Sequence, residues 1–255
     1  MTSPTGTPRV RFWDRLLNPS RVFGVAVDAV QDELVPAWRR AYEGELAWPV
    51  LVALLLAVVL QAMLPGRVVR PLRWLFPVVA LVLVVLIVAR HGTRIHKVSP
   101  WVRATTLLLL AALSGLNIAA GARLVIDLLR SRGIHDAPDL LLTGGAIWLT
   151  NVIIFGLWYW MFDRGGPVAR ATGSTAYPAF LFPQMTCDPQ QNLAKPNWRP
   201  EFFDYLYTSF TNATAFSPTD TMPMLQWAKL TMMLQSAVAL LLAILVIARA
   251  VNVLK

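Results

Sequence analysis

The chain has 255 residues, of which 56% are hydrophobic and only 15% are charged. This balance excludes an ordinary soluble domain and indicates an all-α integral membrane protein, because membrane-spanning helices are built from long apolar runs. The net charge of +9 does not indicate a nucleic-acid partner, since the basic residues stand in short clusters beside apolar runs, where they meet the headgroups of the lipid bilayer.

The first region, residues 1–45, begins with a polar arm that contains three prolines. From Ser20 to about Arg40, apolar residues recur every three or four positions, which predicts an amphipathic helix lying in the membrane interface. Acidic residues on its polar side weaken the attraction to anionic lipid. Packing on the protein's own surface is therefore the alternative.

Five apolar runs are long enough to be transmembrane helices: 46–64, 72–89, 104–122, 140–162 and 230–248. The first three and their loops form a second region, residues 46–139, and residues 140–255 form a third. The first apolar run begins near Leu46, too far along the chain for a cleavable signal, so we expect it to stay as a membrane anchor. The sequence thus predicts a multi-pass membrane protein.

Four polar residues lie well inside these runs: Asn117, Asn151, Gln235 and Ser236. A polar side chain in hydrocarbon needs a hydrogen-bond partner, so we expect all four to face the interior of the helix bundle. Hydrogen bonding between helices is one role for them, and lining a conduit is the other.

A shorter amphipathic segment lies between the last two runs. Pro200 suits the first position of a helix and Glu201 its first turn, which predicts a helix from Pro200 to about Thr214 with an apolar side. Its length of about 21 Å is too short to cross a bilayer, so we expect a re-entrant half-helix. The proline-rich and glycine-rich segment before it predicts a long irregular connector.

Residues of this segment resemble the pore loop of potassium channels. Ser209 and Phe210 match the end of the pore helix, Thr214 matches a filter threonine, and Asp220 and Pro223 match the acid and proline that close the loop. The resemblance covers about residues 198–250 and implies a re-entrant pore-type helix followed by an inner helix.

The filter itself departs from the family's Thr-Val-Gly-Tyr-Gly pattern. No glycine follows Gly173, which argues against potassium selectivity of the familiar kind, because filter glycines supply conformations that other residues resist. The filter-like residues of this chain are Thr214, Ala215, Phe216, Ser217, Pro218, Thr219 and Asp220. The segment is also similar to one in a family of bacterial polytopic membrane proteins of no assigned function, which implies a bacterial plasma (inner) membrane.

The channel resemblance implies a homo-oligomer, a tetramer by analogy, whose mouth presents rings of hydroxyls and of Asp220 carboxylates. Such rings favour monovalent cations without fine discrimination. The alternative is a non-conducting membrane scaffold, sensor or assembly partner that keeps the pore-loop fold, since a fold does not by itself imply a function.

No catalytic or metal-binding pattern is present in the sequence, and we expect neither enzymatic activity nor a cofactor. His91, His96 and His135 stand in predicted short loops, no His-Glu-x-x-His or Cys-x-x-Cys motif occurs, and Cys187 is the only cysteine. The orientation is not decided by basic residues, which number eight in the loops on each side. The channel resemblance places the amino terminus and the pore loop outside.

Overall fold

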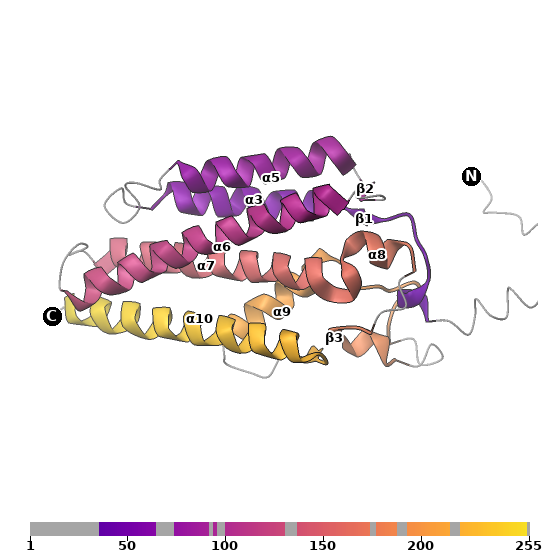
Figure 1. Ribbon diagram of the computed structural model, residues 1–255. Helices are drawn as coiled ribbons and strands as arrows, with labels where there is room; N and C mark the ends of the chain where they lie inside the picture. The colour runs from indigo at the N-terminus through magenta and orange to yellow at the C-terminus, as the bar shows by residue number, and fades with distance from the viewer. Residues whose placement is uncertain are drawn as a thin grey trace, which may run out of the picture.

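The computed structural model describes residues 36–64, 74–91, 94–95, 100–130, 137–173, 177–187, 193–214 and 220–253. Within this part of the chain, five long helices form one elongated bundle in which sequence neighbours run antiparallel (Figure 1). They are α3 (Trp48–Ala62), α5 (Leu75–His91), α6 (Pro100–Leu129), α7 (Ala137–Phe162) and α10 (Gln226–Val253). The predicted all-α class is confirmed.

Three of these helices have the length and composition of membrane spans. Arg103–Leu129, Ala137–Gly165 and Gln226–Val251 contain 27, 29 and 26 residues. At 1.5 Å per residue each is about 40 Å long, more than the roughly 30 Å of a hydrocarbon core. The described chain therefore has the helices of a membrane protein.

The expected spans at 104–122, 140–162 and 230–248 fall inside these three helices. The other two, at 46–64 and 72–89, correspond to α3 and α5, which are apolar but only 15 and 17 residues long. Three of the five expected spans thus correspond to helices that are long and apolar enough to cross a membrane, and the spans at α3 and α5 stay a prediction.

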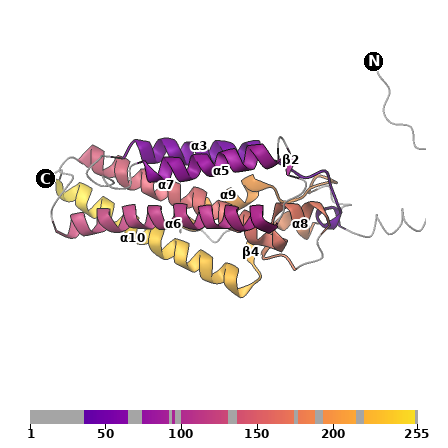
Figure 2. The ribbon, with the colours of Figure 1, turned by 45° about the horizontal axis from the view of Figure 1, so that its top comes forward.

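Helix α7 lies at the centre of the bundle and packs against α3, α6 and α10 (Figures 1 and 2). Two of its glycines allow close approach. A Cβ added at Gly144 would lie 2.7 Å from a methyl carbon of Val246 on α10, and one added at Gly156 would lie 3.2 Å from the backbone of Leu206. Glycine is required at position 144 because any side chain there would push α7 and α10 apart.

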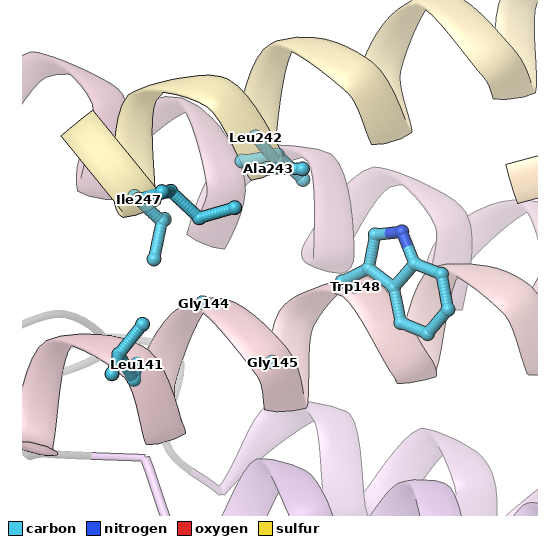
Figure 3. A pocket seen from close by; sticks show the side chains of 8 residues that line it. Leu141, Gly144, Gly145, Trp148, Leu242, Ala243 and Ile247 are labelled. Carbon is cyan, nitrogen blue, oxygen red and sulfur yellow. The ribbon is translucent and has the colours of Figure 1, made fainter. Parts of the chain in front are cut away.

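Beside Gly144 the surfaces of α7 and α10 form a small, open apolar hollow of about 200 Å³ (Figure 3). It is lined by Leu141, Gly144, Gly145, Trp148, Leu242, Ala243, Val246 and Ile247. None of these side chains is charged, and only the Trp148 indole carries a polar atom. We regard the hollow as a packing feature of the α7 and α10 contact.

Short elements gather at the end of the bundle where α3 begins and α7 finishes (Figure 1). Strand β1 (Glu45–Leu46) pairs antiparallel with β2 (Arg94–Ile95), and β3 (Phe180–Leu181) pairs antiparallel with β4 (Met222–Pro223). The expected irregular connector after α7 contains η2 (Asp163–Gly165), α8 (Pro167–Ala171), β3 and η3 (Pro183–Met185).

The predicted interfacial helix from Ser20 to Arg40 lies mostly outside the described residues. Its described end contains only the 3-10 helix η1 (Ala37–Arg39). The interfacial helix therefore stays a prediction.

Candidate functional site

The short helix α9 (Phe202–Thr214) lies between α7 and α10 (Figure 1). Near its start the Tyr205 hydroxyl donates a hydrogen bond to Asp163 Oδ2, just after the end of α7, at 2.6 Å. Further on, Ser209 Oγ donates to the carbonyl of Val152, near the middle of α7, at 2.7 Å. Helix α9 therefore enters the bundle at the end where α7 finishes and runs antiparallel to it.

The chain returns from α9 to the same end of the bundle. The hydroxyls of Thr208 and Thr221 are hydrogen-bonded at 3.1 Å, and the Met224 N–H donates to the Ala179 carbonyl at 2.8 Å. The pairing of β3 with β4 fixes the residues just before α10 against the connector that follows α7. Entry into α9 and exit from the segment after it thus lie at one end of the bundle.

Gln235 on α10 holds the buried side of α9. Its side chain is completely buried, and Nε2 donates to Ser209 Oγ at 2.7 Å and to the Ser209 carbonyl at 3.0 Å. Its Oε1 accepts from the Tyr159 hydroxyl at 2.6 Å and from Asn212 Nδ2 at 2.8 Å. One amide therefore joins α7, α9 and α10, and its own hydrogen-bonding capacity is used in full.

Ser236, the next residue on α10, adds to this attachment. Its hydroxyl lies 3.0 Å from the Asn212 carbonyl and 3.1 Å from Asn212 Oδ1. Asn212 Nδ2 also donates to the Met232 carbonyl at 2.9 Å. Gln235 and Ser236, two of the four intramembrane polar residues identified in the sequence, thus both bind α9.

The filter-like residues are described only at the two ends of the segment. Thr214 is the last residue of α9, where its Oγ1 donates to the Thr211 carbonyl at 2.8 Å, and Asp220 is exposed. The residues between them lie outside the described part of the chain: Ala215, Phe216, Ser217, Pro218 and Thr219.

The aromatic side of α9 is about half exposed, although Phe203 packs edge-to-face with Trp48 and Phe210 with Trp148. Phe203, Tyr207 and Phe210 are 54%, 53% and 45% exposed. The opposite side, which carries Thr208 and Ser209, is fully buried. This distribution is the reverse of a soluble amphipathic helix and fits a surface that meets lipid or another apolar protein face.

A cluster of buried charges lies beside the first turns of α9. Arg170 on α8 is 1% exposed and Glu45 on β1 is 3% exposed. Arg170 Nε donates to Glu45 Oε1 at 2.9 Å, and Nη2 makes an ion-pair contact with the same oxygen at 2.8 Å without hydrogen-bond geometry. Nη1 donates to the carbonyls of Trp160 and Asp163 at 2.8 and 2.9 Å, and Trp160 Nε1 donates to Glu45 Oε2.

Asp163 extends this Glu45–Arg170 cluster to α9. Its Oδ1 accepts from the Ala179 N–H at 2.7 Å, while Oδ2 accepts from Tyr205. The turn after Asp163 is left-handed, with φ of 83° at Gly165 and 94° at Gly166. A Cβ at Gly166 would lie 2.9 Å from the Met161 carbonyl, so glycine is required for the chain to fold back and bring Arg170 under α7.

The surroundings of this cluster keep the Tyr42 phenol and the Arg170 guanidinium protonated, so that both can donate hydrogen bonds to Glu45. Burial, followed by the nearby Glu45 carboxylate, raises the pKa of Tyr42, so the phenol stays protonated and donates to Glu45 Oε1 at 2.9 Å. Burial alone would lower the pKa of Arg170, but Glu45 and other negative groups outweigh it and the pKa is raised. The guanidinium is therefore a permanent cation inside the fold.

Sequence reasoning did not find the Glu45–Arg170 cluster. Arg164 and Arg170 were counted only among the basic residues of the loops, whereas both are at most 3% exposed. Glu45 and Arg170 are 125 residues apart, and their encounter depends on the whole bundle being in place. The one signal in the sequence was the pair Gly165 and Gly166, because two adjacent glycines permit a sharp reversal of the chain after α7.

The other two intramembrane polar residues share no hydrogen bond with α9 in the described chain. Asn117 on α6 is 4% exposed and accepts a hydrogen bond from Gln61 Nε2 at 3.0 Å, and its own Nδ2 donates to the Ile147 carbonyl at 3.4 Å. Asn151 on α7 is also 4% exposed, but its Nδ2 is buried with no partner. Asn117 therefore joins α3, α6 and α7, whereas Gln235 and Ser236 bind α9.

Among the described residues no three His, Cys, Asp or Glu side chains gather in a way that would hold a metal ion. Comparison of the chain with protein-family models, with curated proteins and with solved structures finds no match.

Proposed function

We propose that α7, α9 and α10 form a pore-loop-type unit in a multi-pass membrane protein, with α9 as a re-entrant half-helix. The observation that carries the proposal is that the chain enters and leaves α9 at one end of the bundle, between two helices that have the length of spans. Helix α9 has 13 residues, which at 1.5 Å each gives about 20 Å, enough for half a bilayer. A helix that stops at membrane depth is tolerated where the backbone beyond it is buried in protein or faces water.

In this proposal α3 and α5 also cross the bilayer, which completes five spans. Each long helix runs in the direction opposite to the one before it. The described start of the chain and the end at which the chain enters α9 therefore lie on the same side (Figure 1). The carboxyl terminus lies on the other side. By the channel resemblance, the side with α9 is external in a bacterial plasma membrane.

The proposed activity is weakly selective passage of monovalent cations through a homo-oligomer, a tetramer by the channel resemblance. Asp220 follows the filter-like residues and is exposed, so in an oligomer its copies would form a ring of carboxylates that concentrates cations. The exposed aromatic side of α9, with Phe203, Tyr207 and Phe210, supplies an apolar surface on which a neighbouring subunit packs.

One observation favours a second candidate, a non-conducting membrane scaffold. The polar groups that hold α9 in place, those of Ser209, Asn212 and Gln235, are bonded within the same chain. A helix fixed by its own chain does not need a pore around it, and it can serve as part of a rigid surface that binds a partner protein.

Ion flux into liposomes separates the two candidates. Purified protein, shown to be folded and oligomeric, is compared with Asp220→Asn and with Glu201→Gln, a control at the exposed acid beside the first turn of α9. The channel proposal predicts cation flux above that of empty liposomes, an Asp220→Asn flux lower by about tenfold at low salt, and an unchanged Glu201→Gln flux. Absence of flux from folded, oligomeric protein overturns conduction and favours the scaffold.

A further inference from the structure

A second, larger cavity lies between α6, α7 and α10, on the face of α7 that does not hold α9. Its volume is about 500 Å³, within the range of about 300–1,000 Å³ that is usual for small-molecule sites. Figure 2 shows α10 running obliquely to α6, so that the first turns of α10 diverge from α6. The cavity is lined mainly by apolar and aromatic side chains, among them Ile118, Phe155, Trp158, Phe162, Trp227 and Leu234.

The cavity opens on the outer surface of the bundle. Ile118 on α6 and Leu234 on α10 stand in its lining and are 62% and 58% exposed. Both belong to helices that have the length of membrane spans, so this surface faces hydrocarbon. A ligand reaches the cavity sideways from the bilayer and must itself be soluble there.

The polar side chains in the lining differ in whether they have a hydrogen-bond partner within the protein. Ser114, Asn117, Tyr159 and Thr231 already hold hydrogen bonds inside the protein. Asn151 does not: it is 4% exposed, and its Nδ2 is buried without a partner. Of the buried side-chain atoms without a partner in the described chain, this is the one that belongs to a residue of the cavity.

An unpaired amide N–H inside a membrane protein costs free energy that a hydrogen-bond acceptor would recover. Because Asn151 is among the residues that line the cavity, a rotation of its side chain would present this donor, in otherwise apolar and aromatic surroundings, to a molecule that fills the cavity. A plain hydrocarbon chain would leave this donor unpaired, and a charged headgroup would lose its hydration. Both are poorer occupants than an apolar molecule with one accepting oxygen.

We propose that this cavity is a binding site for a bilayer-soluble molecule that has an aromatic or aliphatic body and an uncharged hydrogen-bond-accepting oxygen, such as a ketone or quinone carbonyl, which Asn151 Nδ2 binds. The site is separate from α9 and Asp220, so it stands whether or not the protein conducts ions.

A decyl-substituted benzophenone tests the proposal on the full chain in nanodiscs. Its ketone is the hydrogen-bond acceptor, and on illumination the same ketone inserts into nearby C–H bonds and marks the residues around it. The expected result is saturable labelling of peptides that contain 111–118, 151–162 or 227–234, which together line the cavity. Labelling spread along all exposed helix surfaces, without saturation, overturns the site.

Two glycine variants show whether the cavity itself is responsible. A Cβ added at Gly115, in the lining, meets nothing within 4 Å, and the same is true of Gly145, which is not in this lining. Gly115→Leu therefore adds a side chain to the cavity from a position where its Cβ meets no other atom, and should reduce saturable labelling at least fivefold. Gly145→Leu makes the same chemical change elsewhere and should leave labelling unchanged; equal labelling of the two variants contradicts the proposal.

The role of Asn151 is tested by substitution and by competition. Asn151→Leu should weaken binding of the benzophenone by about fivefold, the loss of one hydrogen bond, while the variant folds as well as the wild type because an unpaired donor is removed. The matching decyl-diphenylmethane, which lacks the oxygen, should compete about fivefold less well than the unlabelled ketone. Equal competition by the two compounds would show that the cavity takes any hydrocarbon chain and would overturn the assignment to Asn151.

Discussion

Gln235 on α10 and Ser209 on α9 are joined twice, through the hydroxyl of Ser209 at 2.7 Å and through its carbonyl at 3.0 Å. The pair lies near the middle of the bundle, since Ser209 also bonds to Val152 of α7. It attaches a helix of 13 residues to two helices of 26 and 28 residues, and both side chains are fully buried, so water cannot replace the lost bonds.

Replacing this amide should loosen α9. Gln235→Leu keeps a similar volume but leaves Ser209, Asn212 and Tyr159 without the partner they share, and should lower the free energy of unfolding by about 2 kcal/mol. Thr231→Val is the matched control, because the Thr231 hydroxyl bonds only to carbonyls of its own helix. Unfolding in detergent mixtures measures both, and equal losses would contradict the role given to Gln235.

The Glu45–Arg170 cluster should be sensitive to loss of either charge. Glu45→Gln is nearly isosteric but leaves the buried Arg170 without its counter-charge, which should cost about 3 kcal/mol of stability. Glu201→Gln, the same change at an exposed acid, should change stability by less than about 0.5 kcal/mol.

A double-mutant cycle completes the test of this cluster. Glu45→Gln combined with Arg170→Met removes both charges and should cost less than the sum of the two single substitutions. Additive losses in thermal unfolding would show that the two side chains do not depend on each other.

The contact of α7 with α10 depends on a single glycine. Gly144→Ala places a methyl group 2.7 Å from a methyl of Val246 and should destabilise the protein by about 2 kcal/mol. Gly145→Ala, one residue on, meets nothing within 4 Å and should be neutral or stabilise the helix by about 0.5 kcal/mol.

Truncation of Val246, the side chain that faces Gly144, gives an independent check on the contact of α7 with α10. Because Val246→Ala removes the two methyl groups that crowd the new Cβ, it should recover part of the loss caused by Gly144→Ala. If Val246→Ala and Gly144→Ala are simply additive, the close approach does not explain the effect.

The orientation can be read from the native cysteine. Cys187 is partly exposed on the connector after α7, at the end of the bundle where α9 begins. If that end is external, a membrane-impermeant maleimide should label Cys187 in intact cells, and Cys187→Ser should abolish the labelling. In the Cys187→Ser background, Leu129→Cys at the opposite end should be labelled only after permeabilisation; the reverse pattern would show the opposite orientation.

The positions of the long helices were predictable because hydrophobicity over about 20 residues is a local property. The runs at 104–122, 140–162 and 230–248 each lie within an observed helix, and Pro200 and Glu201 correctly marked the approach to α9. The ends were less accurate: α6 continues to Leu129, beyond the apolar run, because a helix that leaves hydrocarbon can keep its backbone bonds while carrying charged side chains.

The contacts of the candidate site could not be predicted in the same way. Nothing local distinguishes Arg170, which is buried against Glu45, from an arginine that meets headgroups. The apolar side of α9 was visible in the sequence as Phe203, Leu206, Tyr207 and Phe210, but the pattern does not say whether that side faces inward. In a membrane the hydroxyl-bearing side turns inward to find hydrogen bonds, and the aromatic side is left outside.

The re-entrant course of α9 is tested most directly by measuring membrane depth along it. Spin labels are placed by Phe203→Cys, Tyr207→Cys, Phe210→Cys and Met222→Cys in the Cys187→Ser background, all at exposed positions. The account predicts that depth increases from Phe203 through Tyr207 to Phe210 and is shallow again at Met222. Equal depth at all four sites, as for a helix lying on the surface, or depth that passes the bilayer centre and emerges on the far side at Met222, would contradict it.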